Sequence, residues 1–417
     1  MRRTPLYAIY VADAISLTGN AAAQLAIPWF VLTTTGSATL TALAVFFNFV
    51  PIVLAAFFGG VIVDRLGFRT TSVVADLASA GAVAAIPLLH STVGIELWQV
   101  FALVFIGALL DAPGATARAA VLPDLVELAG VPMERASGIR SGIQQLAVLL
   151  GAPLGGLMVA TLGPTNALWL DSASFLVSAA LVAFLVPRPA HEDEEKEPGR
   201  FLSELAEGMR FIWNERMLRA VVLTVLCTNL LDAPFPVVMA VFAEETYGSA
   251  ADLGLMFGVF GGGALLGALI YSAMGHRLPR RKTFVFSFAL IPLMYLTMAT
   301  GPPLPVALAA LGIVGLAAGP INPLLFTMLT EIVPTRLRGR VFGAVRAGAW
   351  ASIPLGVLVG GVLVGTIGFA MTFLAIGVAY AVVVSFGFVN RAFRDMDQIR
   401  PVSREGANGA LPASQDS

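Results

Sequence analysis

Four acidic side chains interrupt long apolar stretches of the sequence: Asp13, Asp111, Asp232 and Glu331. A carboxylate in apolar surroundings is costly when ionised, unless it is paired, hydrogen-bonded or in contact with water. Burial therefore favours the neutral acid, whereas water or a nearby cation favours the charged one. Side chains that can be switched in this way are suited to carrying protons or to binding cations.

Polar residues recur beside two of these acids. Asp13, Asn20 and Gln24 are separated by seven and four positions, so in a helix they share one face. Asn229 precedes Asp232 by about one helical turn. We therefore expect these positions to form polar walls of a cavity.

An acid and a base lie at similar depths in two other apolar stretches. Asp76 and Arg118 enter their stretches about equally far, so we predict a structural ion pair between them. Asp111 and Arg118 are seven residues apart on one helical face, which is too far for direct contact. The predicted pair would leave Asp111 available. Asp171 has no basic residue at its depth, and capping, hydrogen bonding and titration all remain open for it.

The elements that must position these residues are membrane helices. Hydrophobic residues make up 57% of the 417 residues and charged residues 12%, which excludes an ordinary soluble domain. A bilayer core about 30 Å thick needs about 20 apolar helical residues per crossing. We predict twelve such helices. They lie near residues 7–32, 40–63, 70–90, 97–122, 138–162, 165–187, 218–243, 252–275, 282–300, 304–329, 341–366 and 369–391.

Several classes of function are excluded by what the sequence lacks. A formal net charge of −1 with scattered basic residues gives no nucleic-acid surface. The single Cys227 and three dispersed histidines offer neither a disulfide, a metal site nor a nucleophile with its base. The glycine-rich stretch 258–267 lies in an apolar helix without a following Lys-Ser/Thr, so it is no nucleotide loop. We therefore expect no enzyme activity, no metal and no cofactor.

Basic residues test this division into spans, because cytoplasmic loops carry the excess of Lys and Arg. All 25 basic residues lie in alternate loops, at the adjoining helix ends or at the termini. The intervening loops carry only acids. This pattern predicts that both termini are cytoplasmic. We also expect the first span to stay as a membrane helix rather than a cleaved signal peptide, because its apolar run is longer than that of a signal peptide and no small-residue cleavage site followed by a soluble domain is present.

Composition divides the chain into two halves. We predict an N-terminal six-helix bundle over 1–187, a linker with an amphipathic helix over 188–217, a C-terminal bundle over 218–391 and a disordered tail over 392–417. Shifting the sequence by 212 positions aligns Gly36 with Gly248, and a shift of 205 aligns Gly163 with Gly368. The halves therefore read as a tandem repeat, a plan in which one half rocks against the other around a midplane site.

The loop between the second and third spans carries a recognisable motif. Gly60, Asp64, Arg65, Gly67 and Arg69 in GVIVDRLGFRT resemble the signature of the major facilitator superfamily at this loop, with Thr70 replacing the last basic residue. Glycine permits close helix approach and tight turns, and an acid can bind a helix N-terminus or an arginine. The resemblance implies a latch that holds the halves together on the inner side.

A degenerate copy of that motif, HRLPRRK, lies at 276–282 and contributes Arg277 and Arg281 to the predicted latch. His276 stands where the first copy has its acid, so we expect a latch of unequal strength.

A second motif lies in span five. Gly138, Gly151, Gly155 and Gly156 occupy glycine positions of a pattern common in proton-coupled exporters of that superfamily, with Pro153 one residue later than the pattern's proline. Small residues at four-residue spacing permit close packing and proline bends a helix, so generic packing explains the pattern about as well. With LPDLV and NALWLDSASF, the chain resembles the bacterial branch of macrolide and siderophore exporters.

The resemblance implies an all-α membrane protein of two six-helix bundles, in which spans one, four, seven and ten line a central cavity. It would place Asp13, Asp111, Asp232 and Glu331 around that cavity. We predict a monomeric transporter of the bacterial cytoplasmic membrane that exports amphipathic, drug-like compounds or secondary metabolites in exchange for protons. Its partners would be a small-molecule substrate, protons and the lipid bilayer.

Alternatives remain open at this point. An uptake symporter of the same fold would use the same residues, because an acid that binds proton and substrate together supports symport. A membrane sensor without transport would normally carry a soluble domain.

The latch interpretation predicts the behaviour of Asp64→Asn. Loss of the negative charge removes the predicted contact but not the basic residues that set orientation, so we expect normal insertion and a reduced turnover. Substrate flux per inserted molecule measures the turnover. Normal flux in the variant would mean that the motif serves only to anchor the helices at the membrane edge.

Overall fold

The structure is a computed structural model that describes residues 3–187, 201–334 and 337–389, with side chains at 56–62, 64–65, 201–205, 276 and 387–389 excepted. Within these ranges the chain is helical and contains no strand. The predicted linker at 188–200 and tail at 392–417 lie outside the described residues.

Six membrane spans form the first bundle. They are α1 (Thr4–Thr35), α2 (Ala38–Leu66), α3 (Phe68–Thr92), α4 (Leu97–Ala120) continued by α5 (Leu122–Ala129), α6 (Met133–Leu162) and α7 (Pro164–Leu185).

The second bundle follows the short helix α8 (Phe201–Asn214). It contains α9 (Arg216–Asp232), α10 (Phe235–Tyr247), α11 (Ala250–Met274), η1 (Gly275–Arg277), α12 (Arg280–Ala299), α13 (Leu304–Ala318), α14 (Ile321–Ile332) and α15 (Arg338–Val389). Pro234 and Pro320 lie in the breaks between α9 and α10 and between α13 and α14, because proline cannot donate the backbone hydrogen bond that a continuous helix needs.

Eleven stretches of the described chain are long and apolar enough to cross a membrane. The last of them contains Gly368 at φ 75° and ψ 169°, where two helices meet at a kink within α15. Counting these two helices separately gives twelve spans, so the predicted fold class is confirmed.

The repeat is visible in the turns between helices. Gly36 and Gly248, which align at the first shift, have φ of 64° and 63°. The serine after each glycine caps the next helix, because the Oγ of Ser37 and of Ser249 accepts a backbone N–H. Gly163 and Gly368, aligned at the second shift, share φ of 85° and 75°. Positive φ favours glycine at each of these turns.

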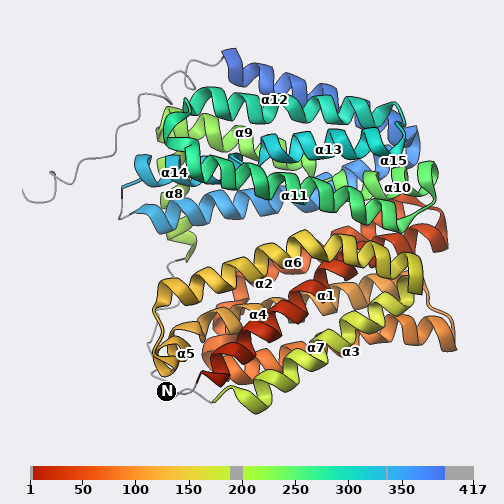
Figure 1. Ribbon diagram of the computed structural model, residues 1–417, viewed down its shortest axis with the longest axis vertical. Coiled ribbons are helices and arrows are strands. Elements are labelled where there is room, and N and C mark those ends of the chain that lie inside the picture. Colours follow the sequence, from red (N-terminus) through yellow and green to blue (C-terminus); the bar gives the residue numbers. More distant parts are fainter. Residues whose placement is uncertain (1–2, 188–200, 335–336, 390–417) are drawn as a thin grey trace, which may run out of the picture.

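The two bundles lie side by side, with α6 of one next to α11 of the other (Figure 1). Labels α5, α8, α14 and the N-terminus mark one end of the molecule, which we call the linker end. The bundles pack closely toward the opposite end, where the last turns of α6 meet the first turns of α11. There α6 crosses α11, and α2 packs on α15.

Glycine backbones form the crossing between α6 and α11. A β-carbon at Gly254 would lie 2.6 Å from the carbonyl oxygen of Ala152 and 2.9 Å from Cα of Gly156. The span-five glycines thus permit close packing, and Gly151 and Gly155 do the same against α1.

Two other positions of that motif behave differently. Gly138 faces open space, so it takes no part in the packing, whereas Pro153 lies against Gly258. On the α2 and α15 side, Thr39 Oγ1 donates to the carbonyl of Gly361 at 3.3 Å.

Helix α8 is fixed to the second bundle. Ile212 is 3% exposed and packs with Leu218 and Val341, whereas Trp213 on the other face is exposed. This division agrees with the amphipathic character predicted for the segment. Glu207 forms an ion pair with Arg340 at the start of α15.

The crossing predicts a difference between two glycine-to-alanine variants. Gly254→Ala forces the backbones of α6 and α11 apart, and such overpacking costs about 1–3 kcal/mol. Gly81→Ala, in α3, meets no atom within 4 Å and is the matched control, since both changes bring the same gain in helix propensity. We expect Gly254→Ala to melt at a lower temperature in detergent solution than the control. Equal or higher melting would contradict the crossing.

Candidate functional site

A cavity of about 850 Å³ lies between the bundles. Its first wall comes from α1, α2, α3, α4 and α7, and its second from α8 and α15. The polar lining is concentrated on the first wall, with Asn20, Gln24, Asn48, Asp111, Thr116 and Asp171. The second wall carries small residues with Met209, Arg346 and Trp350. A cavity of this size and lining can accommodate a drug-sized molecule.

Asp111 presents a carboxylate to this cavity from α4. Its Oδ2 accepts a hydrogen bond of 3.0 Å from Asn20 Nδ2 on α1. Its Oδ1 is buried and has no hydrogen-bond partner among the described residues. Asn20, Gln24 and Asp111, three of the seven residues assigned from the sequence to a cavity, therefore line the same one.

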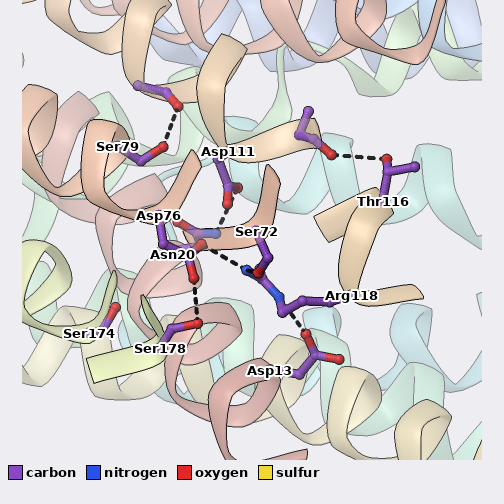
Figure 2. A network of polar contacts seen from close by, with 12 residues as sticks. Asp13, Asn20, Ser72, Asp76, Ser79, Asp111, Thr116, Arg118, Ser174 and Ser178 are labelled. Carbon is purple, nitrogen blue, oxygen red and sulfur yellow. Dashed lines mark hydrogen bonds and ion pairs between the residues drawn. The ribbon is translucent and has the colours of Figure 1, made fainter. Parts of the chain in front are cut away.

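Asp13 occupies a different place from the one expected. Arg118 Nε lies 2.8 Å from Asp13 Oδ1, and Arg140 Nε lies 3.0 Å from Asp13 Oδ2. These bonds hold Asp13, 2% exposed, in the interior of the first bundle (Figure 2). It does not line the cavity, because two arginines on other helices turn it inward.

Asp76 completes this cluster. Arg118 Nη1 lies 2.7 Å from Asp76 Oδ1, and Ser178 Oγ donates to Asp76 Oδ2 at 2.7 Å. The contact between Asp76 and Arg118 that the sequence predicted is therefore present (Figure 2). Arg140 was not anticipated, since it lies in the helix end next to the basic loops and reads there as an orientation signal.

Asp232 forms a separate cluster in the second bundle. It ends α9 just before the break at Pro234, and it accepts hydrogen bonds from Tyr295 Oη at 3.1 Å and Tyr380 Oη at 3.0 Å. Neither Asp232 nor the half-buried Asn229 lines the cavity. The expected cavity position is thus not found for either residue. The half-buried Asp232 is instead bound by the tyrosines of α12 and α15.

Glu331 is also placed away from the cavity. It lies near the end of α14, where both its oxygens bind Arg280 at 2.5 and 2.9 Å. The expectation that acids of four spans surround one cavity therefore holds for Asp111 alone. Each of the other three acids binds a partner on another helix instead of lining the cavity.

The structure describes part of the predicted latch. Gly67, with φ 79°, makes the turn between α2 and α3, and Arg69 donates to the carbonyl of Ala183 in α7. The side chains at Gly60, Asp64 and Arg65 lie outside the described residues, so the latch stays a prediction. Arg277 ends η1 and Arg281 lies in the first turn of α12.

Comparison with known proteins agrees with this architecture. The family described as "Transmembrane secretion effector" matches residues 1–413. "Multidrug efflux pump Tap" of Mycobacterium tuberculosis is 33% identical over 381 residues, which cover 90% of each chain. "Macrolide efflux protein A" of Streptococcus pyogenes is 22% identical over 89% of this chain and 92% of its own.

A solved structure shows the same fold. The nucleoside transporter NupG superposes with a TM-score of 0.72 at 11% identity, covering 96% of this chain and all 100% of its own. Together, the family match over nearly the whole chain and the twelve-helix architecture show that this protein belongs to the transmembrane secretion effectors of the major facilitator superfamily.

Proposed function

We propose that this protein is a secondary transporter that exports amphipathic, drug-like compounds in exchange for protons. The observation that carries the proposal is the cavity between the bundles, whose apolar walls surround the acid Asp111. Relatives named for multidrug and macrolide efflux also support the proposal of export.

The arrangement of contacts supports alternating access. The bundles touch through backbone at the end away from the linker, and the cavity lining reaches Met209 of α8 and Arg346 near the start of α15 at the linker end. Rocking of one bundle against the other would close this end and open the opposite one. We propose that the linker end is cytoplasmic, as the basic loops predict, and that one copy of the chain in the bacterial cytoplasmic membrane suffices.

Proton coupling is assigned to Asp111 and Asp232. Asp111 has one buried oxygen without a partner among the described residues, so a proton or a bound substrate can satisfy it in turn. Competition between the two for one carboxylate produces antiport. Asp232 lies outside the cavity and is held by two tyrosine hydroxyls, so it can exchange a proton without contacting the substrate.

Transport into inside-out vesicles tests this assignment. With an imposed pH gradient and a panel of dyes and antibiotics, we expect gradient-driven uptake by the unaltered protein. Asp111→Asn and Asp232→Asn replace each acid by an amide of the same shape that cannot release a proton, so the response to the gradient should fall about tenfold or more.

Asp124→Asn is the matched control for both variants, because Asp124 is exposed on α5 outside the cavity. It should transport as the unaltered protein does. If both test variants keep the full proton dependence, the coupling assignment is wrong.

The direction of transport is tested in intact cells. Export predicts that cells producing the protein hold less of a transported dye than cells without it, and that collapsing the proton gradient removes the difference. Greater accumulation in the producing cells would favour the uptake symporter of the same fold.

A further inference from the structure

Among the charged residues described above in the interior of the first bundle, the acids outnumber the bases. Arg118 and Arg140 are both bound to Asp13, and Arg118 also binds Asp76. These two bases and two acids form a neutral group in the bundle interior. Asp111 and Asp171 remain, and neither has an ion-pair partner among the described residues, although both line the cavity.

Asp171 is held in place by its own helix and by a glycine on α1. It is 2% exposed, and Ser174 Oγ, which donates to the carbonyl of Asp171 at 2.7 Å, lies 3.4 Å from Asp171 Oδ1. A β-carbon at Gly19 would lie 2.6 Å from that same oxygen. Glycine at this position therefore leaves the space that the carboxylate occupies. The next residue, Asn20, binds Asp111, so consecutive positions of α1 contact the two acids.

Two unpaired carboxylates at bilayer depth require compensation when they are ionised. Most of the surrounding lining is apolar and includes Ile27, Val83, Ile86 and Phe175, and the uncharged polar side chains there, such as Gln24 and Asn48, carry no positive charge to compensate the acids. A small hydrated ion would lose its water against such walls, and an anion would be repelled by both acids. A cation with an apolar body satisfies the carboxylates and buries its own surface in the same step.

The basic residue of the cavity does not compensate these acids. Arg346 is exposed on the second wall, and its guanidinium carbon lies 5.8 Å from the centre of the Trp350 ring. No hydrogen bond or ion pair joins it to Asp111 or Asp171 within the described part of the chain.

We propose that Asp111 and Asp171 form a subsite for one organic cation, such as a protonated amine or a quaternary onium group, with its apolar body against the lining of α1, α3 and α7. This inference rests on the proposed transport function and adds the charge of the substrate to it. Asp171 is a binding residue in this account, alongside the coupling acid Asp111.

Binding to the purified full-length protein, without any gradient, tests the subsite. Tetraphenylphosphonium is a permanent cation of suitable size, and triphenylphosphine oxide is a neutral analogue with three of the same rings. At mildly alkaline pH we expect the cation to bind about tenfold or more tightly than the neutral compound, and tetraphenylborate, an anion of the same shape, to bind most weakly.

The variants Asp111→Asn and Asp171→Asn should each weaken binding of the cation about tenfold without weakening binding of the neutral analogue, whose oxygen an amide N–H can also bind. Retained binding of triphenylphosphine oxide shows that a variant is folded. Asp124→Asn, outside the cavity, is the control and should bind all three probes as the unaltered protein does.

Two outcomes would overturn the subsite: binding of the cation no tighter than that of the neutral analogue, or cation affinity unchanged when both acids are replaced together. Vesicle transport separates this failure from failure of the proposed function. Gradient-driven export of neutral compounds alone would leave the exporter intact and remove the cation subsite. Selective cation binding without any transport would leave the cation subsite intact and contradict the proposed export.

Discussion

The structure of the first bundle depends on how Arg118 is paired. This guanidinium is 1% exposed in a membrane span, where an unpaired charge would destabilise the fold strongly. Its bonds to Asp13 on α1 and Asp76 on α3 compensate the charge and join three helices at one point. Arg140 adds α6 to the same point through Asp13. A neutral interior cluster is thereby built without using the acids that face the cavity.

In the second bundle, the acid within a membrane span is stabilised by tyrosine hydroxyls rather than by a basic residue. At the shift of 212 positions, Asp232 aligns with Asn20 and Tyr295 aligns with the cavity residue Val83. At the shift of 205 positions, Tyr380 aligns with the cavity residue Phe175. Two hydroxyls therefore stand where the first bundle has apolar cavity wall, and they donate hydrogen bonds to the acid. The aligned position lines the cavity in the first half and is bound by two tyrosines in the second.

Periodicity and charge placement were sufficient to predict the fold. Runs of about 20 apolar residues leave little choice of structure in a bilayer, and the aligned glycines Gly36 and Gly248 adopt the same conformation. The contact between Asp76 and Arg118 was also predictable from depth. Depth, however, does not give the rotation of a helix about its axis, so the turn of Asp13 toward Arg118 and Arg140 could not be foreseen. The tyrosines around Asp232 were missed because a buried tyrosine in an apolar run carries no distinguishing pattern.

Helix α8 links the connection between the two bundles to the shape of the cavity. It belongs to the segment that joins the two halves, yet its Met209 forms part of the cavity wall. The segment that connects the two repeats therefore contributes to the wall of the cavity. A substitution at Met209, whose side chain is exposed, would therefore reshape the compartment while every membrane span keeps its sequence.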